Sequence, residues 1–433
     1  MKRDRIVLLV VLVFFCRTTF SAPLSLSVSA DVAILMNAET GAVLYEKRGR
    51  HKTYPASLTK IATLLHACRS VADRGGGGRF EEKVTCPAPC LRTIRPELKR
   101  AHGYEDPPYI LETDGTAFGI RVGEILSLGD LLHGMMLVSG NDAANCVAYH
   151  IGGTVSGFAE EMNRYVRRLG CSDTRFLNPH GLHHPGHVST AYDLALITRE
   201  LVQNGPAFAI FGKERYVCDK TNRRESVAIR HNGRLLQPGT FHYPRVIGMK
   251  TGYHAAAGYT LAAVAKEGDR MLIAVVLGCK SSVRRYRDVI RLFEEAFSQE
   301  KVTRLLFHEE DPLLMRLDLS RSGSREGHLC RVRPAKGVAI SYFPAEIPDI
   351  TVTMEKRDRP LPIGKGEVVG DLYVTDDRGS LLAHSPLCAD EEIGPRGFRG
   401  WVSRVRKSVR ASGRRGGGGV PSCRPSPPPQ GSR

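Results

Sequence analysis

Ser57-Leu-Thr-Lys60 opens a stretch in which apolar residues recur every three or four positions from Ala56 to about Arg69. That period predicts an α-helix. One helical turn places residues three apart on the same face, so the Lys60 amine can approach the Ser57 hydroxyl. An alcohol is a poor nucleophile until a base takes its proton, and a lysine can be that base where burial and a nearby positive charge lower its pKa. Alone, the spacing is weak evidence, because a serine and a lysine three apart usually form a solvated helix face.

Two further motifs strengthen this interpretation. Ser139-Gly-Asn141 lies in an apolar stretch with helical spacing, and Lys250-Thr-Gly252 begins a predicted strand. Taken singly, the first is typical of a surface turn and the second of an ordinary strand start. In this order, however, S-x-x-K, S-x-N and K-T-G form the signature described for penicillin-binding proteins and serine β-lactamases. Accident explains one such motif easily, but not three in order and each in a fitting context.

Longer stretches carry a more specific signal. They include Ser139-Gly-Asn-Asp-Ala-Ala-Asn145, Thr174-Arg-Phe-Leu-Asn-Pro-His-Gly-Leu182, Pro185-Gly-His-Val-Ser-Thr-Ala-Tyr-Asp-Leu194 and Leu361-Pro-Ile-Gly-Lys-Gly-Glu-Val-Val-Gly370. Together they resemble the D-alanyl-D-alanine carboxypeptidases among the low-molecular-mass penicillin-binding proteins. The resemblance extends from about Ala30 to Ile393, and its last stretch is similar to that family's small C-terminal β domain.

The predicted fold class is α+β. Periodicity predicts a hairpin at 32–44, helices at 126–149, 155–169, 190–202 and 284–297, and a strand hairpin at 259–277. Short alternating runs from 302 to 393 predict a small all-β module. The resemblance implies a β-lactamase/transpeptidase-like catalytic domain at 30–299, an antiparallel sheet flanked by helices, followed by a small all-β sandwich domain at 302–393.

Catalytic roles follow from the resemblance, position by position. Ser57 is expected to attack the penultimate D-alanine carbonyl, with Lys60 as general base. Ser139 and Lys250 are expected to relay the proton to the departing D-alanine, and Asn141 to hydrogen-bond the substrate backbone. The reaction needs no cofactor and no metal.

Substrate-binding roles follow in the same way. Lys250, Thr251 and Arg285 are expected to receive the terminal carboxylate, which suits cationic and hydroxyl donors. The amide of the nucleophile and one on the strand after Gly252, that of His254, are expected to form the oxyanion hole.

The chain also departs from the family's pattern. The interval from Ser57 to Ser139 is longer than the family commonly shows, and the excess lies at about 74–111, a loop-rich insertion. Two residues past K-T-G, His254 stands where the family tends to have threonine. These differences bear on substrate preference and deacylation, while the nucleophile and base remain.

Alternative functions on the same fold stay open. A serine β-lactamase is one, although no E-x-x-L-N motif lies between Ser139 and Lys250. A D,D-endopeptidase that cuts cross-links is another. A catalytically silent wall-binding protein is a third, but such a protein would have no need to keep all the motif residues.

Two clusters could suggest a metal site. His180, His183, His184 and His187 lie in a Pro/Gly loop that belongs to the resemblance, so zinc binding is not expected. Cys86-Pro-Ala-Pro-Cys90 lacks a matching second pair, so a local disulfide or two free thiols are expected instead.

The chain ends predict location. Basic residues precede an apolar run, Ile6 to Cys16, that is too short to span a bilayer, which indicates a signal peptide at 1–22. Residues 396–411, with Trp401, are typical of a basic amphipathic helix on an anionic membrane, and residues 412–433 of a disordered tail. We therefore expect an exported protein at the periplasmic face of the inner membrane.

The formal net charge of +17 requires an anionic neighbour, and export disfavours nucleic acid. Expected partners are peptidoglycan stem peptides and, as covalent inhibitors, β-lactams.

Overall fold

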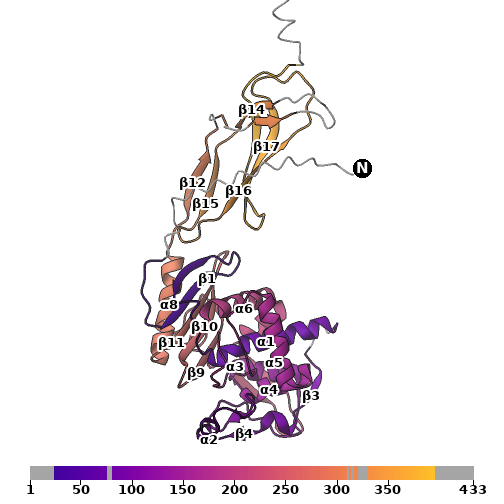
Figure 1. The fold of residues 1–433 in the computed structure, drawn as a ribbon, viewed down its shortest axis with the longest axis vertical. Coiled ribbons are helices and arrows are strands. Elements are labelled where there is room, and N and C mark those ends of the chain that lie inside the picture. The colour runs from indigo at the N-terminus through magenta and orange to yellow at the C-terminus, as the bar shows by residue number, and fades with distance from the viewer. Residues whose placement is uncertain (1–23, 76–79, 310–311, 314–315, 320–328, 395–433) are drawn as a thin grey trace, which may run out of the picture. The chain divides into compact units, whose positions relative to one another are not determined.

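The described part of the chain forms two compact units. The computed structural model describes residues 24–75, 80–309, 312–313, 316–319 and 329–394. One unit runs to Lys301 and includes Phe343–Ile347, and the other holds Val302–Tyr342 and the residues from Pro348 (Figure 1). The predictions for 1–22, 396–411 and 412–433 lie outside the described residues.

A five-stranded antiparallel sheet organises the first unit. Its strands are β1 (Val32–Asn37), β2 (Val43–Lys47), β9 (Val246–His254), β10 (Gly258–Glu267) and β11 (Arg270–Cys279), in the order β2-β1-β11-β10-β9. The hairpin near the start of the described chain therefore pairs with the hairpin that ends the sheet, through β1 and β11. Strand β9 lies at an edge of the sheet and carries the K-T-G motif. The predicted antiparallel sheet is confirmed.

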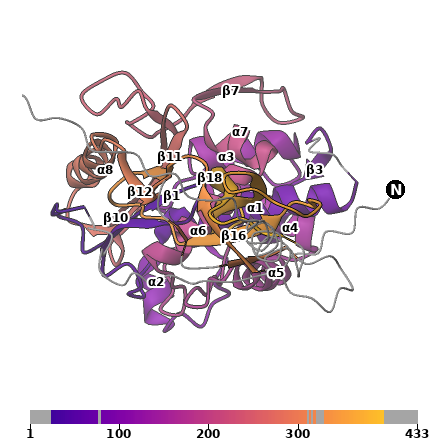
Figure 2. The same ribbon diagram turned by 90° about the horizontal axis from the view of Figure 1, so that it is seen from above.

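Alternation along the strands gives the sheet two apolar faces. Ile34, Ile273 and Val275 belong to the core beneath one group of helices. These helices are α1 (Thr59–Asp73), α3 (Leu128–Leu137), α4 (Asn141–Gly152), α5 (Val155–Arg168), α6 (Ala191–Gln203) and α7 (Gly205–Phe211). The neighbouring residues Leu35 and Ala274 belong to a second core, with α8 (Ser282–Phe297). Helices therefore cover both faces, as Figures 1 and 2 show.

One predicted helix is wrong. The stretch 126–149 is not continuous, because α3 ends at Leu137 and α4 begins at Asn141. Between them Ser139 has φ of +63°, a left-handed conformation that cannot continue an α-helix. Apolar residues at helical spacing lie on both sides of the polar stretch Ser139-Gly-Asn-Asp142, so the hydrophobic period predicted a helix across the break.

Where the structure describes it, the insertion contains only short elements. They are β3 (Lys83–Thr85), the 3₁₀ turn η2 (Ala88–Leu91), β4 (Thr93–Ile94), α2 (Pro96–Ala101) and β5 (Leu111–Glu112). Cys86 and Cys90 are buried free thiols, and both contact the Cys146 thiol of α4. In this structure Cys86 and Cys90 are therefore two free thiols and do not form the local disulfide.

The second unit contains only strands among its described elements. Strands β13 (Arg316–Asp318), β14 (Leu329–Pro334), β16 (Ile350–Lys356), β17 (Val368–Asp376) and β18 (Leu381–Ala389) form one sheet, and β12 (Val302–Phe307) pairs with β15 (Val338–Tyr342). Val332, Val369, Leu372 and Leu387 centre its core. The predicted β-rich C-terminal domain is confirmed.

Candidate functional site

Ser57 and Lys60 lie where two helix types meet. Ser57 belongs to the 3₁₀ turn η1 (Ala56–Leu58), and Lys60 lies in the first turn of α1, in which the amine Nζ comes within 3.0 Å of the Ser57 Oγ. Ala56 just before the serine has φ of +49°, a conformation that is costly for a residue with a side chain and is typical of functional sites. The sequence prediction placed both residues on one helix face, and the structure brings their reactive atoms into contact.

Lys60 Nζ has two further partners. The Asn141 side-chain oxygen and the His180 main-chain oxygen both accept from it, each at 2.7 Å. Lys60 is fully buried, and this burial together with the Lys250 charge lowers its pKa well below its usual value, against the opposing charge of Asp142. A neutral amine can donate to those two oxygens and point its lone pair at the Ser57 hydroxyl. The geometry therefore suits a general base.

Lys250 and Ser139 form a second pair on the other side of the site. Lys250 Nζ donates to Ser139 Oγ at 2.9 Å and to the Thr251 main-chain oxygen at 2.8 Å. Burial, and secondarily the charge of Arg285, lowers the pKa of Lys250 to about 7. The left-handed backbone at Ser139 turns its side chain out of the α3–α4 connection and toward this lysine. Lys250 can therefore exist in both protonation states near neutral pH.

Asp142, which directly follows the S-x-N motif, hydrogen-bonds the loop that lies beside this motif. Its carboxylate accepts the main-chain N–H groups of Phe118, Gly119 and Ile120 at 2.7 to 3.0 Å. The Asn141 N–H also donates to the main-chain oxygen of Thr116 at 3.0 Å. The loop from 114 to 120 is thus fixed beside Asn141 by its own backbone.

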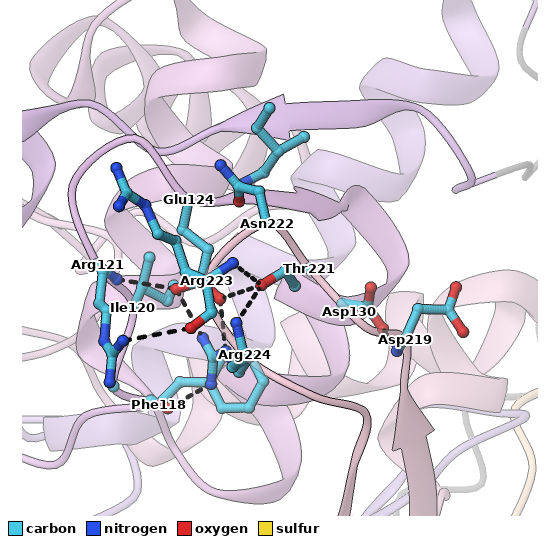
Figure 3. A network of polar contacts seen from close by, with 12 residues as sticks. Phe118, Ile120, Arg121, Glu124, Asp130, Asp219, Thr221, Asn222, Arg223 and Arg224 are labelled. Atoms are coloured by element: carbon cyan, nitrogen blue, oxygen red, sulfur yellow. Dashed lines mark hydrogen bonds and ion pairs between the residues drawn. The ribbon is translucent and has the colours of Figure 1, made fainter.

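A buried ion pair extends this support (Figure 3). Glu124 accepts from Arg224 at 2.6 Å and 3.2 Å, from the Thr221 hydroxyl at 2.8 Å and from the Arg121 N–H at 2.9 Å. Arg224 also donates to the Phe118 main-chain oxygen at 3.2 Å. Burial alone would raise the pKa of Glu124, but the hydrogen bonds from Arg224 and the others outweigh it and lower the pKa. The network ties the loop to the turn between β7 (Arg215–Cys218) and β8 (Val227–Arg230).

Two glycines allow the backbones to approach at the nucleophile. A Cβ on Gly252 would lie 2.8 Å from the Ser57 nitrogen and 2.5 Å from Thr260 Oγ1. A Cβ on Gly181 would lie 1.9 Å from the Ala56 oxygen, and Gly181 has φ of +89°. The K-T-G glycine is therefore required because strand β9 passes directly beside the turn that carries Ser57.

A cleft of about 620 Å³ opens above these residues. Of the predicted site residues, the cleft lining includes Ser57, Ser139, Asn141, Thr251, Gly252, His254 and Arg285. The two lysines, both fully buried, lie under its floor. All nine predicted residues thus fall in or beneath one cleft.

Arg285 and His254 differ in their bonding. Arg285 Nη1 donates to the main-chain oxygens of Gly252 at 3.0 Å and Thr260 at 3.3 Å, while its buried Nε has no partner among the described residues. His254 Nδ1 accepts from the Ala257 N–H at 3.1 Å. Burial, with the charges of His183 and Lys99, lowers the pKa of His254 to about 4, so it is neutral at neutral pH.

Sequence reasoning missed several residues of the site. The roles of Asp142, Gly181 and the His180 carbonyl were not predicted, and neither was the position of Tyr253. The signals were present, since Asp142 directly follows Asn141 and Asn178-Pro-His-Gly181 belongs to the resemblance. A main-chain acceptor, however, leaves no mark in a sequence. Among the described residues no cluster of His, Cys, Asp and Glu could hold a metal ion.

Comparisons with known proteins agree with the family that the motifs resemble. A family model described as D-alanyl-D-alanine carboxypeptidase, Peptidase_S11, matches residues 17–75 and 106–281, and the unmatched 76–105 lie within the predicted insertion. Carboxypeptidase DacC of Escherichia coli is 30% identical over 392 residues, 90% of each chain, and DacF of Bacillus subtilis is 28% identical over 378 residues, 87% of this chain and 89% of DacF. The crystal structure of penicillin-binding protein 5 from Haemophilus influenzae is 26% identical, with a TM-score of 0.57 over 86% of this chain and 99% of that one. The chain therefore belongs to the D-alanyl-D-alanine carboxypeptidase family Peptidase_S11, as its motifs predicted.

Proposed function

We propose that the protein is a serine D-alanyl-D-alanine carboxypeptidase that removes the terminal D-alanine from peptidoglycan stem pentapeptides through an acyl-enzyme on Ser57. The observation that carries the proposal is the contact of 3.0 Å between Ser57 Oγ and a fully buried Lys60 amine whose pKa is lowered. A buried neutral amine beside an alcohol is an arrangement for activating a nucleophile.

Acylation follows from these contacts. Lys60 takes the Ser57 proton while Oγ forms a bond to the carbonyl carbon between the two terminal D-alanines. Ser139 and the Lys250 ammonium, 2.9 Å apart, pass a proton to the leaving nitrogen, so the C–N bond breaks and D-alanine departs. Water then hydrolyses the ester and restores the Ser57 hydroxyl.

The register of β9 supports a different second oxyanion donor from the expected one. The Met249 and Thr251 carbonyls point away from β10, because they accept from His231 Nε2 at 3.0 Å and Lys250 Nζ at 2.8 Å. Main-chain groups alternate along a strand, so the N–H of Tyr253 points to the same side, and that of His254 points back toward β10. We therefore assign the oxyanion hole to the amides of Ser57 and Tyr253 instead of the expected His254.

The terminal carboxylate is assigned to Thr251, Lys250 and Arg285. Thr251 and Arg285 line the cleft, and Lys250 lies below it. Arg285 is held by main-chain oxygens of Gly252 and Thr260, which leaves its guanidinium charge unneutralised by these contacts. A β-lactam, whose carboxylate and strained amide resemble this substrate, is expected to acylate the same serine.

Release of D-alanine from diacetyl-L-Lys-D-Ala-D-Ala tests the proposal. Wild-type protein should release D-alanine, and Ser57→Ala should lower the rate by at least about 10³-fold. Ser70→Ala, a serine farther along the same helix α1 whose hydroxyl bonds the His66 carbonyl, is the matched control and should keep the wild-type rate. Equal rates for wild type and Ser57→Ala would refute the assignment.

We also propose export and attachment to the periplasmic face of the inner membrane. The support is the sequence of residues 1–22 and 396–411, which lie outside the described part. Among the described residues no helix is long and apolar enough to span a membrane. Sedimentation with vesicles containing anionic lipid should retain the full chain and lose a version ending at Gly394, whereas equal sedimentation of both would refute the anchor.

A further inference from the structure

The insertion forms one wall of the catalytic cleft. Lys99 and Arg100 of α2, and Tyr104 just after it, line the same cavity as Ser57. The family model leaves residues 76–105 unmatched, so this wall belongs to the part of the chain that differs from the family pattern. Residues that line the same cavity as the nucleophile can contact a bound substrate.

The position of this wall relates it to the acyl side of the substrate. With the terminal carboxylate at Thr251 and Arg285 and the reacting carbonyl at Ser57, the peptide must extend past the end of β9 at His254. There the rings of His254 and His183 lie 5.1 Å apart, and those of His183 and Tyr104 lie 5.3 Å apart. The residues that precede the scissile bond therefore meet the insertion.

On this side of the cleft two charged residues form a buried ion pair with each other, and two others are exposed. Lys99 is buried and donates to Glu112 at 2.7 Å, which neutralises both and fixes α2 against β5. Arg100 is exposed, and its ion-pair partner within the described part of the chain is Glu97, also exposed, at 3.5 Å, a weak surface contact. Asp114 is exposed on the same cleft, and the described residues offer it no ion-pair partner. One guanidinium and one carboxylate thus remain available at the rim.

We propose that Arg100 and Asp114 form the subsite for the side chain of the third stem-peptide residue, and that this side chain carries both a carboxylate and an ammonium group. The inference rests on the proposed function and names its substrate class. A guanidinium binds a carboxylate through paired hydrogen bonds, and a carboxylate accepts from an ammonium group. The side chain of a diamino dicarboxylic acid residue, with one ammonium and one carboxylate, satisfies both rim charges, whereas a lysine side chain satisfies only Asp114.

Two pentapeptides that differ only at the third residue, meso-diaminopimelate or L-lysine, test the subsite with the full chain. Wild type should show a kcat/KM up to about fivefold higher for the diaminopimelate peptide, the upper end of the effect of a solvent-exposed ion pair. Arg100→Ala should remove this preference, mainly through KM. Asp114→Asn should lower kcat/KM for both peptides, because both carry the ammonium group.

The matched control is Arg95→Ala, since Arg95 is an exposed arginine of the same insertion outside the cleft lining. It should keep the wild-type preference. Titration of Ser57 with benzylpenicillin counts the folded sites of each variant, so a loss of folding is not read as a loss of preference. A wild type without preference, or a preference that survives Arg100→Ala, would overturn the subsite alone. Acylation by benzylpenicillin without D-alanine release from any peptide would instead overturn the proposed function, and the subsite with it.

Discussion

At the scale of single residues, the site depends on close approach between two backbones. Strand β9 can pass beside η1 only because Gly252 has no side chain. Gly252→Ala should therefore displace the Ser57 amide from the oxyanion position and lower the rate of β-lactam acylation by about 10²- to 10³-fold, the effect of losing one oxyanion donor. Stopped-flow acylation with a chromogenic cephalosporin measures this rate. A variant that acylates normally would show that the Ser57 amide has no such role.

A second residue-scale prediction concerns pH. Burial and the Arg285 charge hold the pKa of Lys250 at about 7, so the charged form that receives a carboxylate is lost as pH rises through neutrality. Arg285→Ala removes one cause of the lowered pKa, so the basic limb of the kcat/KM profile should move to higher pH. Its kcat/KM should also fall about tenfold, from one lost charged contact. Arg285→Lys keeps the charge, so the basic limb of the kcat/KM profile should stay at the wild-type pH. A basic limb that does not move in either variant would show that the Arg285 charge does not lower the pKa of Lys250.

At the scale of elements, the break between α3 and α4 carries the second motif. The sequence predicted one helix across 126–149, because hydrophobic spacing reports which side is buried and not where φ changes sign. The left-handed conformation of Ser139 and the acceptance of three loop amides by Asp142 are set by tertiary contacts. The longer helices, the two local hairpins and the motif residues were predictable from local pattern, but the pairing of β1 with β11 and the conformation of the connection were not.

The Glu124 network gives a prediction about the loop over the site. Glu124→Gln leaves Arg224 without a charged partner and should lower the free energy of unfolding by about 2 kcal/mol, less than for a fully buried pair because Arg224 is partly exposed. The pKa of Glu124 is lowered in the folded state, so its contribution is present above the unfolded pKa and is lost as pH falls through the folded one. Urea denaturation at neutral and acidic pH should therefore show a difference between wild type and variant that shrinks in acid. A difference independent of pH would contradict the account.

At the scale of the whole molecule, the first unit is not continuous in sequence. Glu346, in Phe343–Ile347, accepts from Arg270 Nε at 2.8 Å and from the Asn37 side chain at 2.6 Å, and both charged side chains are buried. Glu346→Gln should lower the free energy of unfolding by about 3 kcal/mol, because it leaves a buried arginine unpaired. The exposed Glu300→Gln is the control and should change it by less than about 0.5 kcal/mol. Equal midpoints in urea for the two variants would contradict this.

The sequence predicted an α+β unit followed by a β-rich unit. It also predicted the antiparallel sheet of the first unit and the residues of the cleft, because motif spacing and strand alternation are local properties. It did not predict that a segment beyond residue 302 packs with the first unit, since no periodicity links Glu346 to Arg270. It also gave no role to the insertion, whose residues acquire one only from their place on the cleft wall. Contacts between single side chains far apart in the sequence could not be predicted from the sequence.

Ser57 is the residue that substrate and β-lactam are expected to acylate. The most direct test of this assignment is proteolytic mapping by mass spectrometry of the adduct that forms when the full chain reacts with benzylpenicillin. One adduct is expected, on Ser57, and it should be absent from Ser57→Ala and present in Ser70→Ala. An adduct on another residue, or one that persists in Ser57→Ala, would contradict the assignment.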